Sequence, residues 1–95
     1  MIIWKFNIPA FEYGAIINDV FIIKMPSFSE ILSVGEQEGK LVLWAAVNKH
    51  NPVVPMKFRV IGTGFQEMPS TNRRFIGTVQ RISFDLIAHV FQELE

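Results

Sequence analysis

The chain has 95 residues, of which 49% are hydrophobic and 19% charged, with nine basic and nine acidic side chains and no cysteine. A chain of this length and apolar content forms one domain, over residues 1–95, that buries a core without disulfides, so a disordered chain is excluded. The lack of cysteine excludes disulfides, thiolate metal sites and a cysteine nucleophile, and no apolar run approaches the roughly 18 residues of a membrane span.

Seven short apolar runs, rich in β-branched and aromatic residues and separated by turn-forming residues, indicate β-strands. Their spacing leaves no room for the helical crossovers of a parallel sheet, so we predict an all-β fold, a small antiparallel sandwich or barrel of about seven strands. The predicted strands are Ile2–Asn7, Val20–Lys24, Glu30–Gln37, Lys40–Val47, Met56–Gly64, Arg74–Gln80 and Asp85–Gln92.

Three segments between these runs lack strand periodicity. Pro9–Asp19 allows either a strand extension or a short helical turn. Asn48–Pro55 and Phe65–Arg73 are predicted to be surface loops, the first polar and rigid. Because proline cannot donate to a β-ladder, each proline near the strands should mark a strand end, an edge or a turn. These prolines are Pro26, Pro52 and Pro55.

The clearest hairpin joins Ile31–Val34 to Leu41–Trp44, through a turn in which Gly39 can adopt a positive φ. Alternation along the later strands predicts which side chains face the core. We expect Phe58 and Val60 to point inward, and Lys57 and Arg59 to point outward. For the next strand, the predicted inward residues are Phe75, Gly77 and Val79, and the predicted outward residues are Arg74, Ile76, Thr78 and Gln80.

The zero net charge hides a strong segregation along the chain. Residues 40–81 carry seven basic side chains against one acidic side chain, a net charge of +6, whereas residues 1–39 and 82–95 each carry −3. One interpretation is that these segments interleave as cross-strand ion pairs, each worth only about 0.2–1 kcal/mol. The other is that the arginines of the fifth and sixth strands converge on an anion, because planar guanidinium groups suit phosphates.

No motif predicts catalysis. Gly62-Thr63-Gly64 lacks the remaining positions of a Walker A loop or a dinucleotide fingerprint, and two glycines at a strand end more often form a bulge or bend. His50, in a turn-like context, and His89 are too few to define a metal site. We expect His89 to be a half-buried sheet residue on one face with Ile87 and Phe91, because no nucleophile elbow accompanies it. No enzyme activity, metal or cofactor is therefore expected.

Aromatic residues are abundant, and most of them are expected in the core. A subset could form an exposed stacking surface, since base–aromatic stacking contributes about 1–3 kcal/mol per base. The aromatic residues concerned are Trp4, Phe6, Trp44, Phe58, Phe75 and Phe91. A chain with a pI near 6.7 lacks the broad positive stripe needed for long nucleic acids, whereas a small phosphorylated ligand needs only a local cluster.

Several sequence blocks, taken in order, resemble a family of proteins of about this length and of unknown function, encoded by tailed bacteriophages and prophages. The blocks are Ile3-Trp4-Lys5-Phe6, Met25-Pro26, Ile31-Leu32-Ser33-Val34, Leu43-Trp44-Ala45, Gly62-Thr63-Gly64, Phe75-Ile76-Gly77-Thr78-Val79-Gln80 and His89-Val90-Phe91. The resemblance covers Ile3 to Glu95. It implies a phage origin, and some small phage proteins sequester cyclic nucleotide immune signals without degrading them.

Two hypotheses follow. The first is a non-enzymatic protein that binds and sequesters a small phosphorylated signal, such as a cyclic dinucleotide, to counter host defence in the cytoplasm of an infected cell. Phosphates would contact Arg59, Arg73 and Arg74, with donors from Gly62, Thr63 and Gly64 and a stacking ring from Trp44 or Phe65. We expect a homo-oligomer with the ligand between protomers, and no binding to long nucleic acid or membrane.

The second hypothesis is a protein–protein interaction module, either a host-factor inhibitor or a virion-associated protein, with no small ligand. Such a module would offer an exposed strand or an apolar patch to its partner. Its arginines would then serve solubility.

Overall fold

The computed structural model describes residues 1–8, 19–64, 72–80 and 87–94, and within these residues the chain forms seven strands and no helix. No helix in this described part is long and apolar enough to cross a membrane. The strands are β1 (Ile2–Asn7), β2 (Asp19–Pro26), β3 (Glu30–Gln37), β4 (Lys40–Val47), β5 (Val53–Gly62), β6 (Arg73–Gln80) and β7 (Ile87–Glu93). The prediction of an all-β chain is confirmed, and three of the predicted strands match to the residue.

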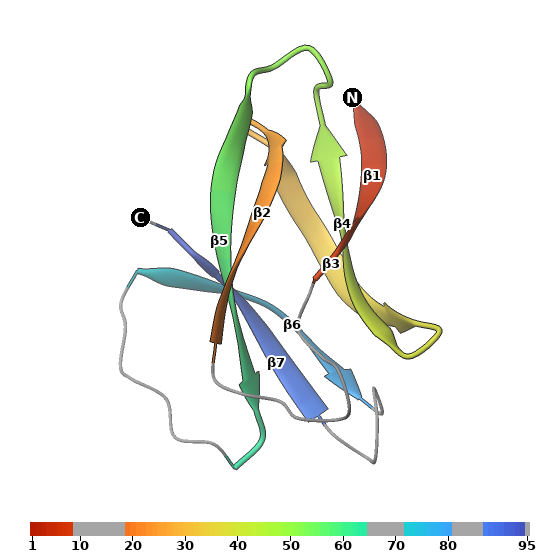
Figure 1. Ribbon diagram of the computed structural model, residues 1–95, viewed down its shortest axis with the longest axis vertical. Helices are drawn as coiled ribbons and strands as arrows, with labels where there is room; N and C mark the ends of the chain where they lie inside the picture. The colour runs from red at the N-terminus through yellow and green to blue at the C-terminus, as the bar shows by residue number, and fades with distance from the viewer. Residues whose placement is uncertain (9–18, 65–71, 81–86, 95) are drawn as a thin grey trace.

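The strands form two antiparallel sheets, which we call sheet A and sheet B. Sheet A has the order β1-β4-β3, and sheet B has the order β2-β5-β7-β6. Figure 1 shows the two sheets as the layers of an open sandwich, with β1 at one side of the molecule. The sheets approach each other closely where β3 of sheet A contacts β6 of sheet B.

The core lies between the inward faces of the two sheets. Phe58 and Val60 of β5 are fully buried, as their alternation with Lys57 and Arg59 predicts. Sheet A contributes alternate residues of β4, which pack against them. The fully or almost fully buried core residues of β4 are Leu41, Leu43, Ala45 and Val47.

A bulge in β6 overturns the predicted orientation of its first half. The register against β7 shifts between Phe75 and Gly77, and an inserted residue in a bulge reverses which side chains face outward. Phe75, predicted to face the core, is therefore 55% exposed on the outer face of sheet B, and Ile76, predicted to face outward, packs against the core. Beyond the bulge the predicted alternation is confirmed, because Val79 is buried and Thr78 is exposed.

The predicted loops are shorter than expected where the structure describes them. β5 already begins at Val53, so the loop after β4 ends at Pro52 and contains the turn in which Asn51 N–H donates to the Asn48 carbonyl. Arg73 belongs to β6. Residues 9–18, 65–71 and 81–86 lie outside the described residues, and the interpretations of Pro9–Asp19 and Phe65–Arg73 rest mainly on them.

All three prolines occupy positions that need no donor, as predicted. Pro26 ends β2 and Pro52 directly precedes β5. Pro55 lies inside β5, opposite Lys24, in the part of the strand that extends past its pairing with β7. This part of β5 is bordered by β2 alone among the described strands, so Pro55 occupies an edge.

The predicted hairpin between β3 and β4 is confirmed, with a two-residue turn at Glu38 and Gly39. Both residues have positive φ, +53° and +78°, as a type I′ turn requires. A Cβ at Gly39 would meet no atom within 4 Å. The glycine is therefore needed for its backbone conformation and not for space.

Gly39→Ala is expected to lower the free energy of unfolding by about 1 kcal/mol, because an L-residue with a Cβ is disfavoured in the left-handed region. Gly39→Asn is the matched control and should lose clearly less, because asparagine tolerates this region. Urea denaturation of the three proteins measures the difference. Equal losses for alanine and asparagine would show that the turn conformation does not cause the effect.

Candidate functional site

The outward side chains of sheet B form cross-strand rows, of which three neighbouring rows frame the candidate site. The register pairs Val20 of β2 with Arg59, and Arg59 in turn with Phe91 of β7. The rows are Ile22–Lys57–Glu93–Arg73, Val20–Arg59–Phe91–Phe75 and Ile61–His89–Thr78. We call this surface the outer face of sheet B. It brings two of the three predicted phosphate-binding arginines, Arg59 and Arg73, onto one side of the sheet.

Glu93 holds both arginines on this face. Arg59 Nε donates to Glu93 Oε1 at 2.8 Å, and Arg73 Nη2 lies 3.6 Å from the same oxygen. The side chains of Arg59 and Glu93 are 23% and 16% exposed, so water still screens the pair in part. Cross-strand pairing between the basic middle and the acidic end of the chain is therefore present. It fixes the orientation of the Arg59 guanidinium group on the outer face of sheet B.

An aromatic pair lies beside these charges. The rings of Phe75 and Phe91 are 5.4 Å apart between centroids and tilted by 57°. The guanidinium carbon of Arg73 lies 5.4 Å from the centroid of Phe91, within the range of a cation–π contact. Phe91 is half-buried, whereas Phe75 presents 55% of its surface to solvent. Phe75 therefore offers an aromatic ring next to a cationic group.

Lys57 adds a third positive charge and borders two surface depressions. One depression, of about 350 Å³, is lined by Lys57, Gln92 and Glu93 together with four apolar residues. The other, of about 240 Å³, is lined by Val20, Lys57, Arg59 and Glu93. Among the described residues of these three rows, three cations and one carboxylate give a local charge of +2, and the exposed Lys24 lies on the same face in the next row.

His89 bridges two threonines at the lower end of this face. Thr63 Oγ1 lies 2.7 Å from His89 Nε2, and Thr78 Oγ1 lies 3.0 Å from His89 Nδ1. A neutral imidazole has one donor and one acceptor nitrogen, so one hydroxyl accepts a hydrogen bond and the other donates one. The prediction that His89 is a half-buried sheet residue is confirmed, and both of its ring nitrogens have hydroxyl partners.

The Gly62-Thr63-Gly64 segment forms the end of β5 and a turn. Gly62 is buried in the strand, and Gly64 has a φ of +91°. Thr63 N–H donates to the Ile87 carbonyl at 3.1 Å, so this amide is used within the protein. Thr63 contributes its hydroxyl to His89, and the segment serves the sheet.

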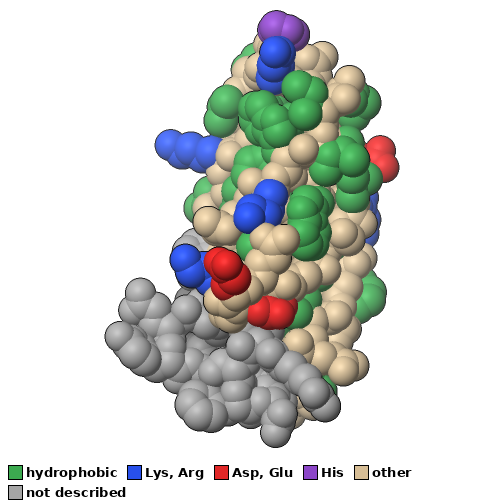
Figure 2. Space-filling model, turned by 90° about the vertical axis from the view of Figure 1, so that its right-hand side faces the viewer, with side chains coloured by type: hydrophobic (Ala, Val, Ile, Leu, Met, Phe, Trp, Pro, Cys, Tyr) green, Lys and Arg blue, Asp and Glu red, His purple; other side chains and the backbone are tan. Residues whose placement is uncertain are grey.

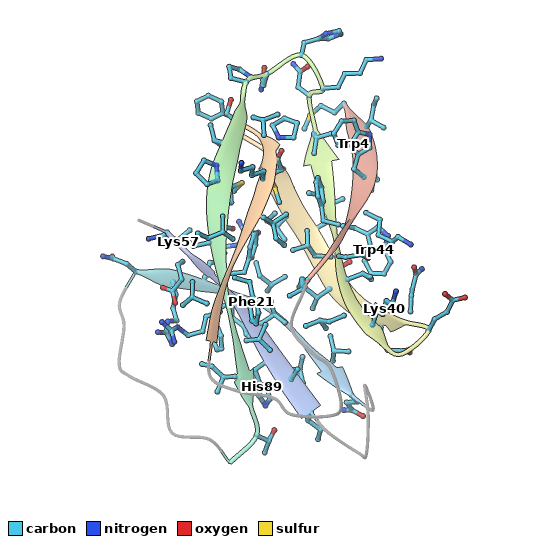
Figure 3. The ribbon with its side chains drawn as sticks, in the orientation of Figure 1. Trp4, Phe21, Lys40, Trp44, Lys57 and His89 are labelled. Atoms are coloured by element: carbon cyan, nitrogen blue, oxygen red, sulfur yellow. The ribbon has the colours of Figure 1, made fainter. Side chains whose placement is uncertain are left out.

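The remaining predicted residues lie elsewhere. Arg74 is on the opposite side of sheet B, where its Nη2 donates to the Ile31 carbonyl at 2.9 Å and links β6 to β3. Trp44 belongs to β4 of sheet A, and its ring covers Gly35. Figure 3 shows Trp44 and Lys57 on opposite sides of the molecule, with Phe21 between them. Phe65 lies outside the described residues.

Sequence reasoning assigned no site role to Lys57, and it included Phe75 and Phe91 only among the aromatic residues of which a subset could form a stacking surface. The alternation along β5 predicts that Lys57 points outward, but it indicates no role for this side chain. Phe91 could have been found, because it shares a face with His89, and that face was expected to be half-buried. Phe75 could not have been found from alternation, because the bulge that turns it outward leaves no signal in the spacing of apolar residues.

Within the described residues, no group of three or more histidine, aspartate and glutamate side chains gathers at a distance that could hold a metal ion. His50 is exposed in the turn after β4, where its N–H donates to Asn48 Oδ1 at 3.0 Å. The chemistry of the outer face of sheet B is thus that of cations, hydroxyls and aromatic rings, which suits anion and ring binding.

Comparison with protein families places the whole chain in one of them. The chain belongs to the family described as Domain of unknown function (DUF7352), which matches residues 1–95. This confirms the expected membership of a family of unknown function. Comparison with curated proteins and with solved structures finds no match.

Glu93→Gln is expected to lower the free energy of unfolding by about 1 kcal/mol or more, because it removes the carboxylate that the partly exposed Arg59 shares with the largely buried Arg73. The loss should shrink in 1 M salt, where the Debye length falls to about 3 Å. Urea denaturation at low and high salt measures both effects. Glu30→Gln, at an exposed position of β3, is the control, and an equal loss in that variant would contradict the assignment.

Proposed function

We propose that this protein is a non-enzymatic binding protein that captures a small phosphorylated nucleotide, such as a cyclic dinucleotide, on the outer face of sheet B. The observation that carries the proposal is the juxtaposition of the exposed Lys57 and the partly exposed Arg59 with the exposed ring of Phe75 on one face of sheet B, where the side chain of Arg73 is largely buried beside them. Phosphate groups and a nucleobase need these two kinds of partner side by side.

The charge distribution favours a small ligand. The local charge of +2 lies on a chain whose net charge is zero, so long-range steering is weak and affinity must come from close pairing. Lys57 is exposed and borders both depressions, which makes it the phosphate contact. Arg59, oriented by Glu93 at 2.8 Å, supplies a guanidinium charge with little conformational freedom left to lose.

The spacing of the two kinds of group fits a nucleotide. Phe75 is on β6 and Arg59 is on β5, with β7 between them. Two strand spacings amount to about 10 Å. A nucleotide with its base on Phe75 can therefore direct its phosphate toward Arg59 and Lys57, passing over the Phe91 ring and the guanidinium of Arg73.

The binding is proposed to occur without turnover. Both ring nitrogens of His89 are engaged by threonine hydroxyls at 2.7 and 3.0 Å, so this histidine is built into the sheet. A ligand on the outer face of sheet B would meet cations and rings that hold it in place. Capture without chemical change is the activity that such a surface favours.

The biological setting is proposed from the sequence blocks that run from Ile3-Trp4-Lys5-Phe6 to His89-Val90-Phe91. Their resemblance to phage and prophage proteins supports a phage origin, and that origin supports sequestration of a host immune signal in the cytoplasm of the infected cell. The cation and aromatic face supports the binding chemistry. These two lines of support are independent of each other.

Titration calorimetry with a panel of cyclic di- and oligonucleotides tests the proposal. Binding heat is expected with at least one nucleotide, and chromatography should then recover that nucleotide unchanged. Absence of heat across the panel would remove the proposal and leave the protein-interaction module as the remaining hypothesis. Consumption of the nucleotide would replace capture by catalysis.

Two pairs of variants locate the binding. Lys57→Glu and Phe75→Ser should each weaken binding roughly tenfold or more, because they remove a phosphate contact and a stacking ring worth about 1–3 kcal/mol. Lys40→Glu, in the hairpin of sheet A, and Phe28→Ser, at a position 93% exposed, are the matched controls and should bind normally. Equal effects in variants and controls would place the ligand elsewhere.

A further inference from the structure

Among the strands that the structure describes, β1 is an edge strand with one unpaired side. It borders only β4 of these strands, and next to it Ile8 N–H donates to the Leu41 carbonyl at 2.9 Å. Hydrogen-bonded and non-hydrogen-bonded pairs alternate along an antiparallel ladder. The even-numbered residues of β1 therefore bond to β4. The odd-numbered residues Ile3, Lys5 and Asn7 turn their backbone N–H and C=O groups toward the unpaired side.

The side chains of β1 expose apolar surface on both faces of this edge, and on the outer face Ile3 is accompanied by the polar Lys5 and Asn7. Ile3, on the outer face of sheet A, is 63% exposed. Ile2 and Trp4 are on the core-facing side, yet they remain 43% and 38% exposed. Figure 2 shows the side of the molecule that carries β1, where hydrophobic side chains gather toward the upper end. An apolar strand with a row of unpaired backbone groups is a template for another strand.

We propose that a second copy of this chain occupies this edge, with β1 pairing antiparallel to β1 of its partner around a twofold axis at Trp4. The two copies of sheet A then form one six-stranded sheet with the order β3-β4-β1-β1-β4-β3. The axis passes through a non-hydrogen-bonded pair made by Trp4 and the same residue of the second copy. Figure 3 shows Trp4 on β1 at the side of the molecule.

Charge selects this register. The backbone N–H and C=O groups that point to the unpaired side of one copy must face those of the second copy. Odd-numbered residues of one β1 therefore pair with odd-numbered residues of the other. A register with Lys5 opposite itself brings two ammonium groups together, which is unfavourable. A register with Ile3 opposite itself pairs only residues 1–5. The register with Ile3 opposite Lys5 pairs residues 1–7 and lays the alkyl stem of the lysine against an apolar side chain.

The same register completes an apolar row on the core-facing side. It places Ile2 opposite Phe6 of the second copy, on both sides of the central tryptophans. Within one chain, Trp4 and Phe6 already have ring centroids 6.3 Å apart. One segment thus supplies both halves of the interface, and a chain with zero net charge adds no overall repulsion between copies. This self-complementarity favours a second copy over an unrelated strand.

A single cysteine tests the register, because the chain has no cysteine of its own. In Trp4→Cys the two sulfur atoms would extend from a non-hydrogen-bonded pair with Cα atoms about 4.5 Å apart, which is within disulfide range. Mild oxidation of the full chain should give a covalent dimer on a non-reducing gel. Ile3→Cys is the control, because in the proposed register the cysteine of each copy lies opposite Lys5 of the other copy and the two cysteines are not paired. Preferential cross-linking of Ile3→Cys would overturn the proposed register.

Sedimentation equilibrium tests the assembly itself. The wild-type chain should show a concentration-dependent mass approaching that of a dimer, and a monomer at all concentrations would overturn the proposal. Ile3→Lys, which sets a second ammonium group opposite Lys5, should raise the dimer dissociation constant at least tenfold. Val53→Lys, at a position of sheet B that is also 63% exposed, should leave it unchanged. Equal effects in the two variants would overturn the assignment to β1.

Discussion

The antiparallel pairing of β5 with β7 is the constraint on which the rest of sheet B depends. It sets Lys57 opposite Glu93 and Arg59 opposite Phe91, and it buries Phe58 and Val60 on the other side. Since side chains alternate along a strand, one register fixes both faces together. A shift by one residue would move the phenylalanine out of the core and the arginine into it, so the core enforces the arrangement of the outer charges.

The carboxylate of Glu93 fixes the positions of the charges in that arrangement. Two arginines from different strands, Arg59 and Arg73, reach the same oxygen, and the partly exposed pair of Arg59 and Glu93 contributes little free energy. Its effect is on position, because it keeps the guanidinium groups beside the rings of Phe75 and Phe91. The two interpretations of the segregated charge are thus compatible, since the ion pair itself orients the cations.

The two proposed surfaces belong to different sheets. The proposed nucleotide face is formed by β2, β5, β6 and β7, whereas the proposed self-association uses the side of β1 that no described strand borders. Pairing at β1 extends sheet A and covers none of the rows on sheet B. A dimer would therefore carry two ligand faces, each made by one chain. This differs from the expectation, made from the sequence, that the ligand lies between protomers. The two proposals are independent, because the two surfaces are formed by different strands.

The sequence predicted most of the strands, because their apolar runs and turn residues are local signals. Lys40–Val47 and Glu30–Gln37 match to the residue, and Gly39 marks the turn between them. The candidate face was predicted in part. Arg59 follows strict alternation in β5, whereas Arg74 and Phe75 exchange faces at the bulge of β6. A bulge depends on the register between two paired strands. The face on which Arg74 and Phe75 lie could therefore not be predicted from the sequence of β6 alone.

By itself, the sequence determined an antiparallel all-β chain with a segregated charge and no cysteine, because composition and period are properties of single segments. The tertiary structure alone decided that Glu93 would join Arg59 to Arg73, that Trp44 would lie on the other sheet, and that β1 would be an edge among the described strands. These outcomes depend on which strands become neighbours. Neighbours are selected by the burial of all inward faces at once, and no single segment carries that information.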